Sequence, residues 1–155
     1  MGYYNAKKFD ARHSIGYLVR RASSIMTAHV EALFRSTELT LLQYIILMNL
    51  RDGLAMTCTD LSKTMSYDSG TVTRVVDQLV QKGMVKRQRS DRDKRIVKLF
   101  VTPSGKSAVE SVLPRVVQKY NTWLEDFTKE EADMLVQLMT KLNNKVCDKS
   151  TGKKG

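Results

Sequence analysis

A run of small polar residues ending in an arginine offers hydrogen-bond donors at the start of a predicted helix. The run consists of Asp68, Ser69, Gly70, Thr71, Thr73 and Arg74. Free backbone amides at a helix N-terminus bind phosphate, and hydroxyl groups donate to phosphates or base edges. An arginine here either bonds bidentately to the O6 and N7 atoms of guanine or clamps a phosphate. The run predicts contact with duplex DNA, with Asp68 as a structural helix cap that also positions the helix on DNA or as a cap alone.

A second group of cations follows on a predicted β-hairpin. Residues 84–89 and 96–101 alternate with the two-residue period of strands, and the segment SDRDKR at 90–95 forms the turn between them. The cations expected to contact DNA are Arg87, Arg89, Arg92, Lys94 and Arg95. Positive charge on a projecting turn suits phosphates or the negative potential of a minor groove.

Short helices must hold the first run in place. A helix over 57–65, capped by Thr57, and a helix over 68–83 are joined by a tight turn. The helix before them begins at a capping box formed by Thr40 and Gln43. Two helices joined in this way form a helix-turn-helix, in which the second helix enters the major groove.

Amphipathic stretches flank this unit on both sides. Apolar residues recur at helical spacing over 11–35, 103–124 and 128–146, and they predict three further helices. Each helix carries an apolar stripe that a compact DNA-reading unit alone does not cover. The stripes pack against one another within the chain or against a second copy of it. A symmetric dimer would address a pseudo-palindromic site whose half-sites lie about one helical turn apart.

The charge balance indicates an anionic partner. The chain of 155 residues has 26 Lys and Arg against 16 Asp and Glu, a net charge of +10, and this length fits one domain. No apolar run approaches the roughly 18 residues that span a bilayer, and the N-terminus lacks a signal-peptide core, so no membrane partner is expected. The two cysteines lack paired spacing, which fits a reducing compartment, and we expect a cytoplasmic protein.

The motifs also occur in a known order. The segments are LTLLQYIIL at 39–47, TDLSKTM at 59–65, SGTVTRVVDQLVQKGMVKR at 69–87 and DKRIVKLFVTPSG at 93–105. From Leu39 to Gly105 the chain resembles the multiple antibiotic resistance regulator (MarR) family of winged-helix transcription factors. The flanking segments GYLVRRA at 16–22 and FTKEEADMLVQLMTKL at 127–142 are also similar to the family. Lys94 stands where the family usually has arginine.

The resemblance implies a mainly α fold with a small β-wing (α+β), a winged helix-turn-helix flanked by N- and C-terminal dimerisation helices. We expect one domain over 1–155, with the winged helix-turn-helix at 39–102 and dimerisation helices at 8–36 and 103–147. The resemblance also implies a short third strand over 54–56 and a wing arginine in the minor groove. It further implies a homodimeric, sequence-specific transcriptional regulator, more commonly a repressor, that binds double-stranded DNA at a pseudo-palindromic operator.

An effector site is predicted on the first helix. His13, Tyr17 and Arg21 recur every four residues and form one stripe. In the family, small phenolic or aromatic-carboxylate ligands often bind where the dimerisation helices meet the winged helix, and this stripe with Tyr44 and Met48 would line such a pocket. Arginine would pair with the carboxylate and tyrosine would contact the ring. The same stripe is also compatible with simple packing in the dimer or partial exposure.

Other functional classes have less support. Cys58 is predicted in the first turn of a helix, where the helix dipole stabilises a thiolate, so thiol-based redox sensing is an alternative to simple packing. The histidines and cysteines lack the paired spacing of a zinc site, and no metal or cofactor is expected. No nucleotide-binding loop or nucleophile motif indicates an enzyme. A constitutive architectural DNA-binding protein without an effector is the remaining alternative.

Overall fold

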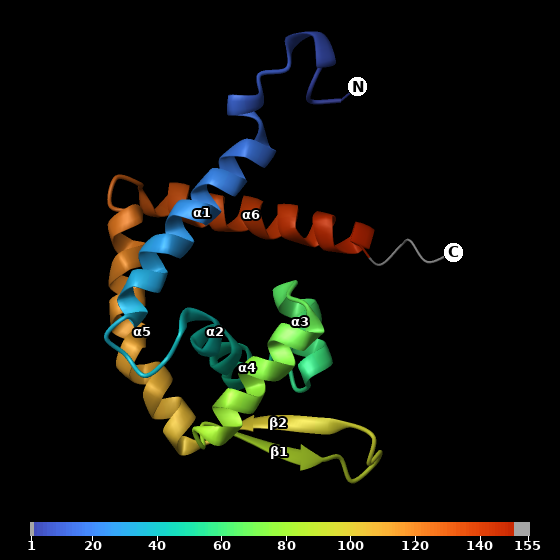
Figure 1. The fold of residues 1–155 in the computed structure, drawn as a ribbon. Helices are drawn as coiled ribbons and strands as arrows, with labels where there is room; N and C mark the ends of the chain where they lie inside the picture. The colour runs from blue at the N-terminus through green and yellow to red at the C-terminus, as the bar shows by residue number, and fades with distance from the viewer. Residues whose placement is uncertain (1, 151–155) are drawn as a thin grey trace. The chain divides into compact units, whose positions relative to one another are not determined.

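The computed structural model describes residues 2–150 and has the predicted mainly α fold with a small β-wing (Figure 1). The elements in chain order are two 3-10 turns, η1 (Ala6–Lys8) and η2 (Ala11–His13), then α1 (Ile15–Phe34), α2 (Leu41–Arg51), α3 (Cys58–Met65), α4 (Ser69–Gln81), β1 (Val85–Arg89), β2 (Val97–Val101), α5 (Pro103–Trp123) and α6 (Lys129–Ser150). The chain divides into two compact units, Met1–Val116 and Val117–Gly155, and each is described by itself.

Local capping sets the ends of the helices. Thr40 and Gln43 form the predicted capping box of α2, with both reciprocal hydrogen bonds at 3.2 Å. Thr57 caps α3 by accepting a hydrogen bond from the amide of Asp60 at 3.1 Å. Gly83 follows the end of α4 with φ of 68°, a left-handed conformation that glycine adopts without strain. The predicted boundaries of these helices are therefore confirmed.

The core of the first unit lies where α2, α3 and α4 meet the sheet. Its fully buried side chains come from one face of each of these helices, from the first part of α5 and from the base of the hairpin. They include Ile46, Leu47, Leu61, Val72, Val76, Leu79, Val85, Val109 and Val112. Full burial of each such side chain stabilises the fold by about 1.5–3 kcal/mol relative to exposure. The amphipathic pattern of the sequence therefore fixes which face of each helix turns inward.

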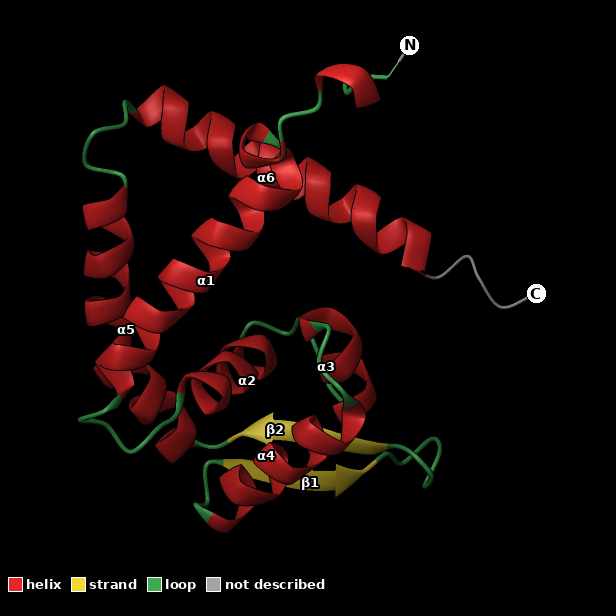
Figure 2. Cartoon of the chain, turned by 45° about the horizontal axis from the view of Figure 1, so that its top comes forward, coloured by secondary structure: helices red, strands yellow, loops and turns green. Residues whose placement is uncertain are grey.

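The two strands form an antiparallel hairpin, the wing. Val85 lies opposite Val101, Arg87 opposite Leu99, and Arg89 opposite Val97 in the register. The turn after β1 projects beyond α2, α3 and α4 in both ribbon views (Figures 1 and 2). The sequence prediction of a hairpin with a basic tip is thus confirmed.

The third strand expected over 54–56 is absent from the described residues. The amide of Leu54 bonds to the carbonyl of Asn49 at 3.0 Å, and the amide of Met56 bonds to Asp60 Oδ2 at 3.2 Å. These amides are committed to the end of α2 and the start of α3, so they are not available for a strand ladder. A single bond from the amide of Leu99 to the carbonyl of Met56, at 2.9 Å, joins this segment to β2.

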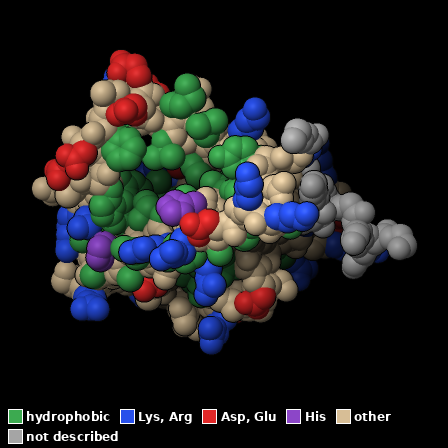
Figure 3. Space-filling model, turned by 90° about the horizontal axis from the view of Figure 1, so that it is seen from above, with side chains coloured by type: hydrophobic (Ala, Val, Ile, Leu, Met, Phe, Trp, Pro, Cys, Tyr) green, Lys and Arg blue, Asp and Glu red, His purple; other side chains and the backbone are tan. Residues whose placement is uncertain are grey.

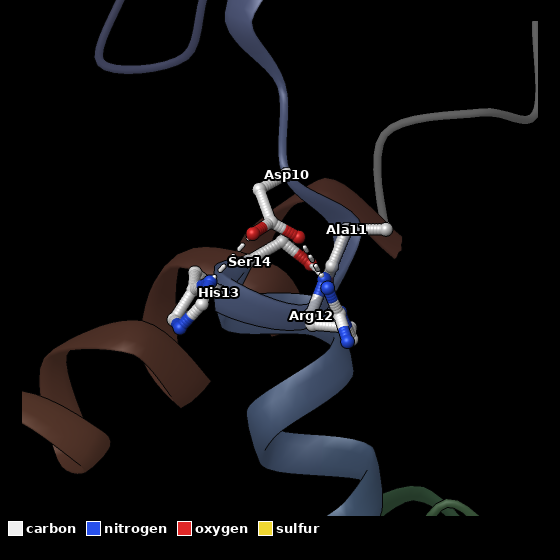
Figure 4. Close-up of polar contacts among 5 residues, drawn as sticks. All are labelled: Asp10, Ala11, Arg12, His13 and Ser14. Atoms are coloured by element: carbon white, nitrogen blue, oxygen red, sulfur yellow. Dashed lines mark hydrogen bonds and ion pairs between the residues drawn. The ribbon is translucent and has the colours of Figure 1, made fainter.

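The first helix begins later than predicted, at Ile15 rather than near residue 11. Asp10 caps the short turn η2 through the amide of Arg12, and the Oδ2 atom of Asp10 lies 2.7 Å from Nδ1 of His13 (Figure 4). Ser14 then starts a new helix, because its hydroxyl accepts from the amide of Tyr17 at 3.3 Å. Two successive caps interrupt the helix, so His13 lies on η2 and does not share a helical stripe with Tyr17.

Hydrogen bonds join the start of α5 to the base of the wing. The hydroxyl of Thr102 donates to the carbonyl of Gly83 at 2.7 Å and accepts from the amide of Gly105 at 3.2 Å. A Cβ atom on Gly105 would collide with the carbonyl oxygen of Met84 and would lie 2.9 Å from Cγ1 of Val101. This position therefore needs glycine for its close approach to the neighbouring backbone.

We predict that Gly105→Ala lowers the free energy of unfolding by about 1–3 kcal/mol, because the added methyl group overpacks a backbone contact. Urea unfolding monitored by circular dichroism measures the change. Gly16→Ala is the matched control, since a Cβ there meets nothing within 4 Å and alanine favours a helix by up to about 1 kcal/mol. Equal stability of the Gly105→Ala variant and the wild type would contradict the close approach.

Candidate nucleic-acid interface

The predicted DNA-reading residues lie along the outer face of α4. Ser69, Gly70, Thr73 and Arg74 are exposed, and Thr71 is half-buried. On the opposite face of the same helix, the valines and the leucine of the core are buried. The period of 3.6 residues separates these two faces, so burial of one face turns the polar run outward.

Asp68 holds the first turn of α4 in place. Its Oδ1 atom accepts a hydrogen bond from the amide of Thr71 at 2.8 Å, and its own backbone is extended, with φ of −65° and ψ of 147°. Hydrogen bonds from the side chain and then the backbone amide of Thr71 hold the pKa of Asp68 below its ordinary value. The predicted cap is confirmed, and the carboxylate favours the positive end of the helix dipole.

The predicted tight turn between α3 and α4 contains a residue with a left-handed backbone. Ser66 adopts a left-handed conformation with φ of 54°, which is uncommon for a residue other than glycine. The hydroxyl of Ser62 donates to the carbonyl of Tyr67 at 2.6 Å and closes the loop. These two serines shape the turn between the helices, and sequence analysis did not identify them because serine is a weak signal for this conformation.

The wing carries its cations on the outside of the hairpin. Arg89, Arg92, Lys94 and Arg95 are exposed. The carboxylate of Asp93 accepts from the amide of Arg95 at 2.9 Å, and the carbonyl of Asp93 accepts from the amide of Ile96 at the same distance. These bonds shape the turn of the wing.

Arg87 differs from the other cations of the wing. Its Nη1 atom lies 2.6 Å from Oδ1 of Asp77 on the outer face of α4. The pair joins β1 to the helix that carries the DNA-reading run. Arg87 therefore has a positioning contact that the sequence did not predict, since Asp77 and Arg87 stand in different elements.

A groove of about 590 Å³ lies between the first turn of α3 and β2. Its lining residues are Thr57, Cys58, Thr59, Asp60, Arg87, Arg95, Ile96, Val97 and Leu99. Cys58 is half-buried at the first position of α3, where the sequence predicted it. The groove combines an apolar wall with two guanidinium groups, and no local sequence signal reveals it because tertiary contact creates it.

The predicted effector residues are spread over three elements. The side chain of His13 on η2 is 82% exposed, and Tyr17 and Arg21 are exposed on α1. Tyr44 on α2 is buried, with its ring centroid 5.2 Å from that of Phe34, and Met48 on the same helix is half-buried. None of these five residues lines the groove beside α3.

The structure also bears on metal binding and on membrane spanning by the described residues. No group of three or more His, Cys, Asp or Glu side chains among them is arranged to hold a metal ion. None of the helices over residues 2–150 combines the length and the apolar character needed to cross a bilayer.

Comparisons with known proteins agree on one family. The sequence model described as MarR family matches residues 39–97. The chain is 32% identical over 106 residues to the multiple antibiotic resistance protein MarR of Escherichia coli K12, which covers 68% of this chain and 74% of that protein. It is also 32% identical to the transcriptional repressor YetL of Bacillus subtilis over 52% of this chain, a match that spans only about half (48%) of YetL.

A solved structure gives the same result. The chain superposes on BpsR of Bordetella bronchiseptica with a TM-score of 0.76 and 26% identity, covering 87% of this chain and 96% of BpsR. That structure addresses the regulation of BpsR binding to DNA by 6-hydroxynicotinic acid. YetL is a transcriptional repressor by name, in agreement with the prediction that the chain is a regulator and not an enzyme.

The cap at Asp68 generates a prediction about pH. Because the pKa of Asp68 is lowered in the folded chain, its contribution to stability is present in full above its ordinary pKa. The contribution is lost as the pH falls through the lowered pKa. In Asp68→Asn the side-chain oxygen still caps the helix but does not titrate, so we expect a weaker loss of stability on acidification than in wild type.

Thermal unfolding from neutral pH to pH of about 3 compares the two proteins, and the carboxyl carbon resonance of Asp68 reports its pKa directly. Asp68→Ala, which removes the capping oxygen, should be less stable than Asp68→Asn at neutral pH. A carboxyl resonance that titrates at or above the ordinary value for aspartate would contradict the role of the hydrogen bonds from Thr71.

Proposed function

The chain belongs to the MarR family of transcriptional regulators, and we propose that it acts as a homodimeric, sequence-specific DNA-binding repressor released by a small aromatic or phenolic effector. One observation carries the DNA-binding part of the proposal. The outer face of α4 and the tip of the wing present donors and cations to solvent from two neighbouring elements of one unit. A helix beside a basic hairpin fits the major groove and the adjacent backbone of duplex DNA.

Each contact has a distinct role in the proposed complex. The amides of Ser69 and Gly70 at the start of α4 bind a phosphate, and the hydroxyl groups of Ser69 and Thr71 donate to phosphates or base edges. Arg74 reads a guanine through its two parallel donors. Thr73 contributes less as a donor, since its hydroxyl already donates to the carbonyl of Ser69 at 2.8 Å.

The wing supplies the electrostatic part of the affinity. Arg89, Arg92, Lys94 and Arg95 are exposed and contact phosphates or the minor groove. Arg87 supports them indirectly, because its ion pair with Asp77 holds β1 against α4. The wing contacts therefore strengthen binding to any duplex, whereas Arg74 selects among sequences.

Apolar surface on the flanking helices supports the homodimer. Hydrophobic side chains are exposed on one face of the molecule (Figure 3). On α1 the exposed large apolar residues are Ile15, Tyr17, Leu18, Ile25 and Met26, and on α6 they are Met134, Leu135, Val136, Leu138 and Val146. Exposed apolar surface on each of these helices marks an interaction site, and two copies related by twofold symmetry bind two half-sites of an operator.

An aromatic acid is the proposed effector. BpsR, a structural neighbour, is regulated by such a compound, and a carboxylate with a ring requires a cation beside an apolar wall. The predicted seat includes His13, Tyr17, Arg21, Tyr44 and Met48, of which Arg21 supplies the cation. The groove beside Cys58, which Arg95 lines, is a second candidate site for a ligand that carries a carboxylate and a ring.

Selection of binding sites from random duplexes tests the proposed function, and we expect an inverted repeat. With that operator, alanine at Arg92, Lys94 and Arg95 should weaken binding to all duplexes and reduce the salt slope by about one for each phosphate that is no longer neutralised. Arg74→Ala should instead reduce the preference for operator over random DNA, by roughly 5-fold to 150-fold if a bidentate bond to guanine is removed.

Fluorescence anisotropy at several salt concentrations gives both quantities. Lys119→Ala serves as the control for loss of one positive charge, because Lys119 lies on α5 outside α4 and the wing. If Arg74→Ala weakened the affinity for operator and for random DNA equally, Arg74 would be a residue that contacts a phosphate and reads no base. Failure of the wild type to enrich any sequence would remove the proposal of an operator.

The effector proposal has its own test. A ligand that binds better to a DNA-incompetent arrangement must weaken operator binding, typically by about 1–3 kcal/mol of coupling. We expect a panel of benzoate-like and phenolic compounds to release the operator from wild type. Arg21→Ala should abolish this response while operator affinity without ligand stays near wild type.

Arg20→Ala, a loss of the neighbouring exposed arginine on α1, is the matched control and should respond as wild type does. A response that survives in Arg21→Ala would exclude the predicted seat and leave the groove beside Cys58. No response of wild type to the whole panel would favour a constitutive DNA-binding protein.

A further inference from the structure

The side chain of Gln43 on α2 is a polar group in the core that the proposed function has not used. The residue is 3% exposed. Burial of an amide side chain without partners costs free energy, so its hydrogen bonds indicate what it does. Every buried side-chain nitrogen and oxygen of the described residues has a hydrogen-bond partner, and Gln43 meets this requirement through groups from three segments.

The hydrogen bonds of Gln43 reach in two directions. Its Oε1 atom accepts from the amide of Thr40 at 3.2 Å and from Nζ of Lys82, also at 3.2 Å. Its Nε2 atom donates to Oε1 of Gln78 at 3.1 Å. Nζ of Lys82 also donates to the carbonyl of Glu38. We call these hydrogen bonds together the Gln43 network.

The Gln43 network joins two parts of the chain that have different proposed roles. Glu38 and Thr40 belong to the connection that leads from α1 into α2. Gln78 lies in the last turns of α4, and Lys82 is the C-cap of that helix. The network therefore ties the C-terminal end of the DNA-reading helix to the connection that follows the proposed dimerisation helix α1.

The Gln43 network lies at the C-terminal end of α4, so it affects the position of the DNA-reading run at the other end of the helix. From Ser69 to Lys82 the helix rises by about 20 Å at 1.5 Å per residue. A tilt of about 10° at the tied end displaces the other end by about 3 Å. Base readout depends on hydrogen bonds that tolerate far smaller errors than this, so the orientation of α4 must be fixed at its tied end.

Helix capping alone does not account for these hydrogen bonds. From the side chain of Gln43, the capping box of α2 requires only the hydrogen bond between Oε1 and the amide of Thr40. The bonds to Gln78 and Lys82 cross to α4, over sequence separations of 35 and 39 residues. If one partner is removed, the buried group that is left without a hydrogen bond destabilises the fold. When all partners are present, the hydrogen bonds fix the orientation of α4.

We propose that Gln43 is a positioning residue that sets the orientation of α4 relative to the α1–α2 connection, and that operator discrimination depends on the Gln43 network. This inference rests on the proposed function. It assigns no DNA contact to Gln43, and it identifies the joint through which a movement of α1 reaches the DNA-reading run.

The test compares full-length variants on the operator that wild type selects and on a random duplex. Gln78→Met removes one hydrogen bond of the network from an exposed position, so the variant should fold normally. Gln43→Met removes every side-chain hydrogen bond of Gln43 at similar side-chain volume, and the amide of residue 43 can still donate to the hydroxyl of Thr40. Gln43→Glu keeps an acceptor for Thr40 and Lys82, and its second oxygen accepts from Gln78 once that amide rotates. Gln81→Met is the matched control, an exposed glutamine of α4 outside the network.

We expect Gln78→Met and Gln43→Met to lower the ratio of operator to random-duplex affinity by about tenfold, the scale of one base contact, with random-duplex affinity unchanged. Gln43→Glu should restore the ratio, and Gln81→Met should not alter it. All affinities are measured well below the thermal midpoint of each variant. Gln78→Met leaves Nε2 of Gln43 without this acceptor, so the thermal midpoint should fall somewhat, and a reduced ratio measured well below that midpoint is not a loss of folding.

Three different results would overturn the inference. If wild type discriminates and Gln78→Met and Gln43→Met keep its ratio, the Gln43 network does not position α4 and only this inference fails. If Gln43→Glu lowers the ratio of operator to random-duplex affinity as much as Gln43→Met does, the hydrogen bonds of the Gln43 network are not the ones that orient α4. If wild type itself shows no preference between duplexes, the proposed function fails and this inference fails with it.

Discussion

Burial of the apolar face of α4 is the constraint on which the rest of the interface depends. Val72, Val76 and Leu79 are fully buried against α2, α3 and the base of the wing. Because side chains repeat every 3.6 residues, this burial leaves Ser69, Gly70, Thr73 and Arg74 facing solvent. The free energy gained by burying the apolar face of α4 thus keeps the hydrogen-bond donors of the opposite face at the surface. The donors therefore need no stabilising interaction of their own.

The electrostatics divide the same surface into positioned and free cations. Arg87 is held by Asp77, and Lys82 is held by the Gln43 network, so both contribute to the geometry of α4. The cations at the tip of the wing are exposed, and contacts between them and phosphates would be screened by salt. In the proposed complex, affinity and sequence preference therefore reside on different elements, which would permit selection to adjust one without the other.

Regulation in a protein of this kind requires a change in one part of the chain to reach α4. A ligand shifts DNA binding only through a difference in its affinity for two arrangements. The connection between α1 and α2 is short, and it bonds through Glu38 and Thr40 to side chains that also contact the end of α4. A polar joint suits this role, because directional hydrogen bonds fix an orientation, whereas apolar packing tolerates sliding.

The sequence by itself determined the helix caps, the hairpin and the outward face of α4, because these depend on groups within about four residues of one another. Local caps that the sequence analysis did not identify begin α1 only after Ser14, so that His13 lies on η2, and local hydrogen bonds occupy the amides of Leu54 and Met56. The tertiary structure alone decided that a groove opens beside Cys58. It also decided the contacts of Asp77 with Arg87 and of Gln43 with Gln78. Such contacts join residues far apart in sequence, and their partners compete with water and with local bonds until packing brings them together.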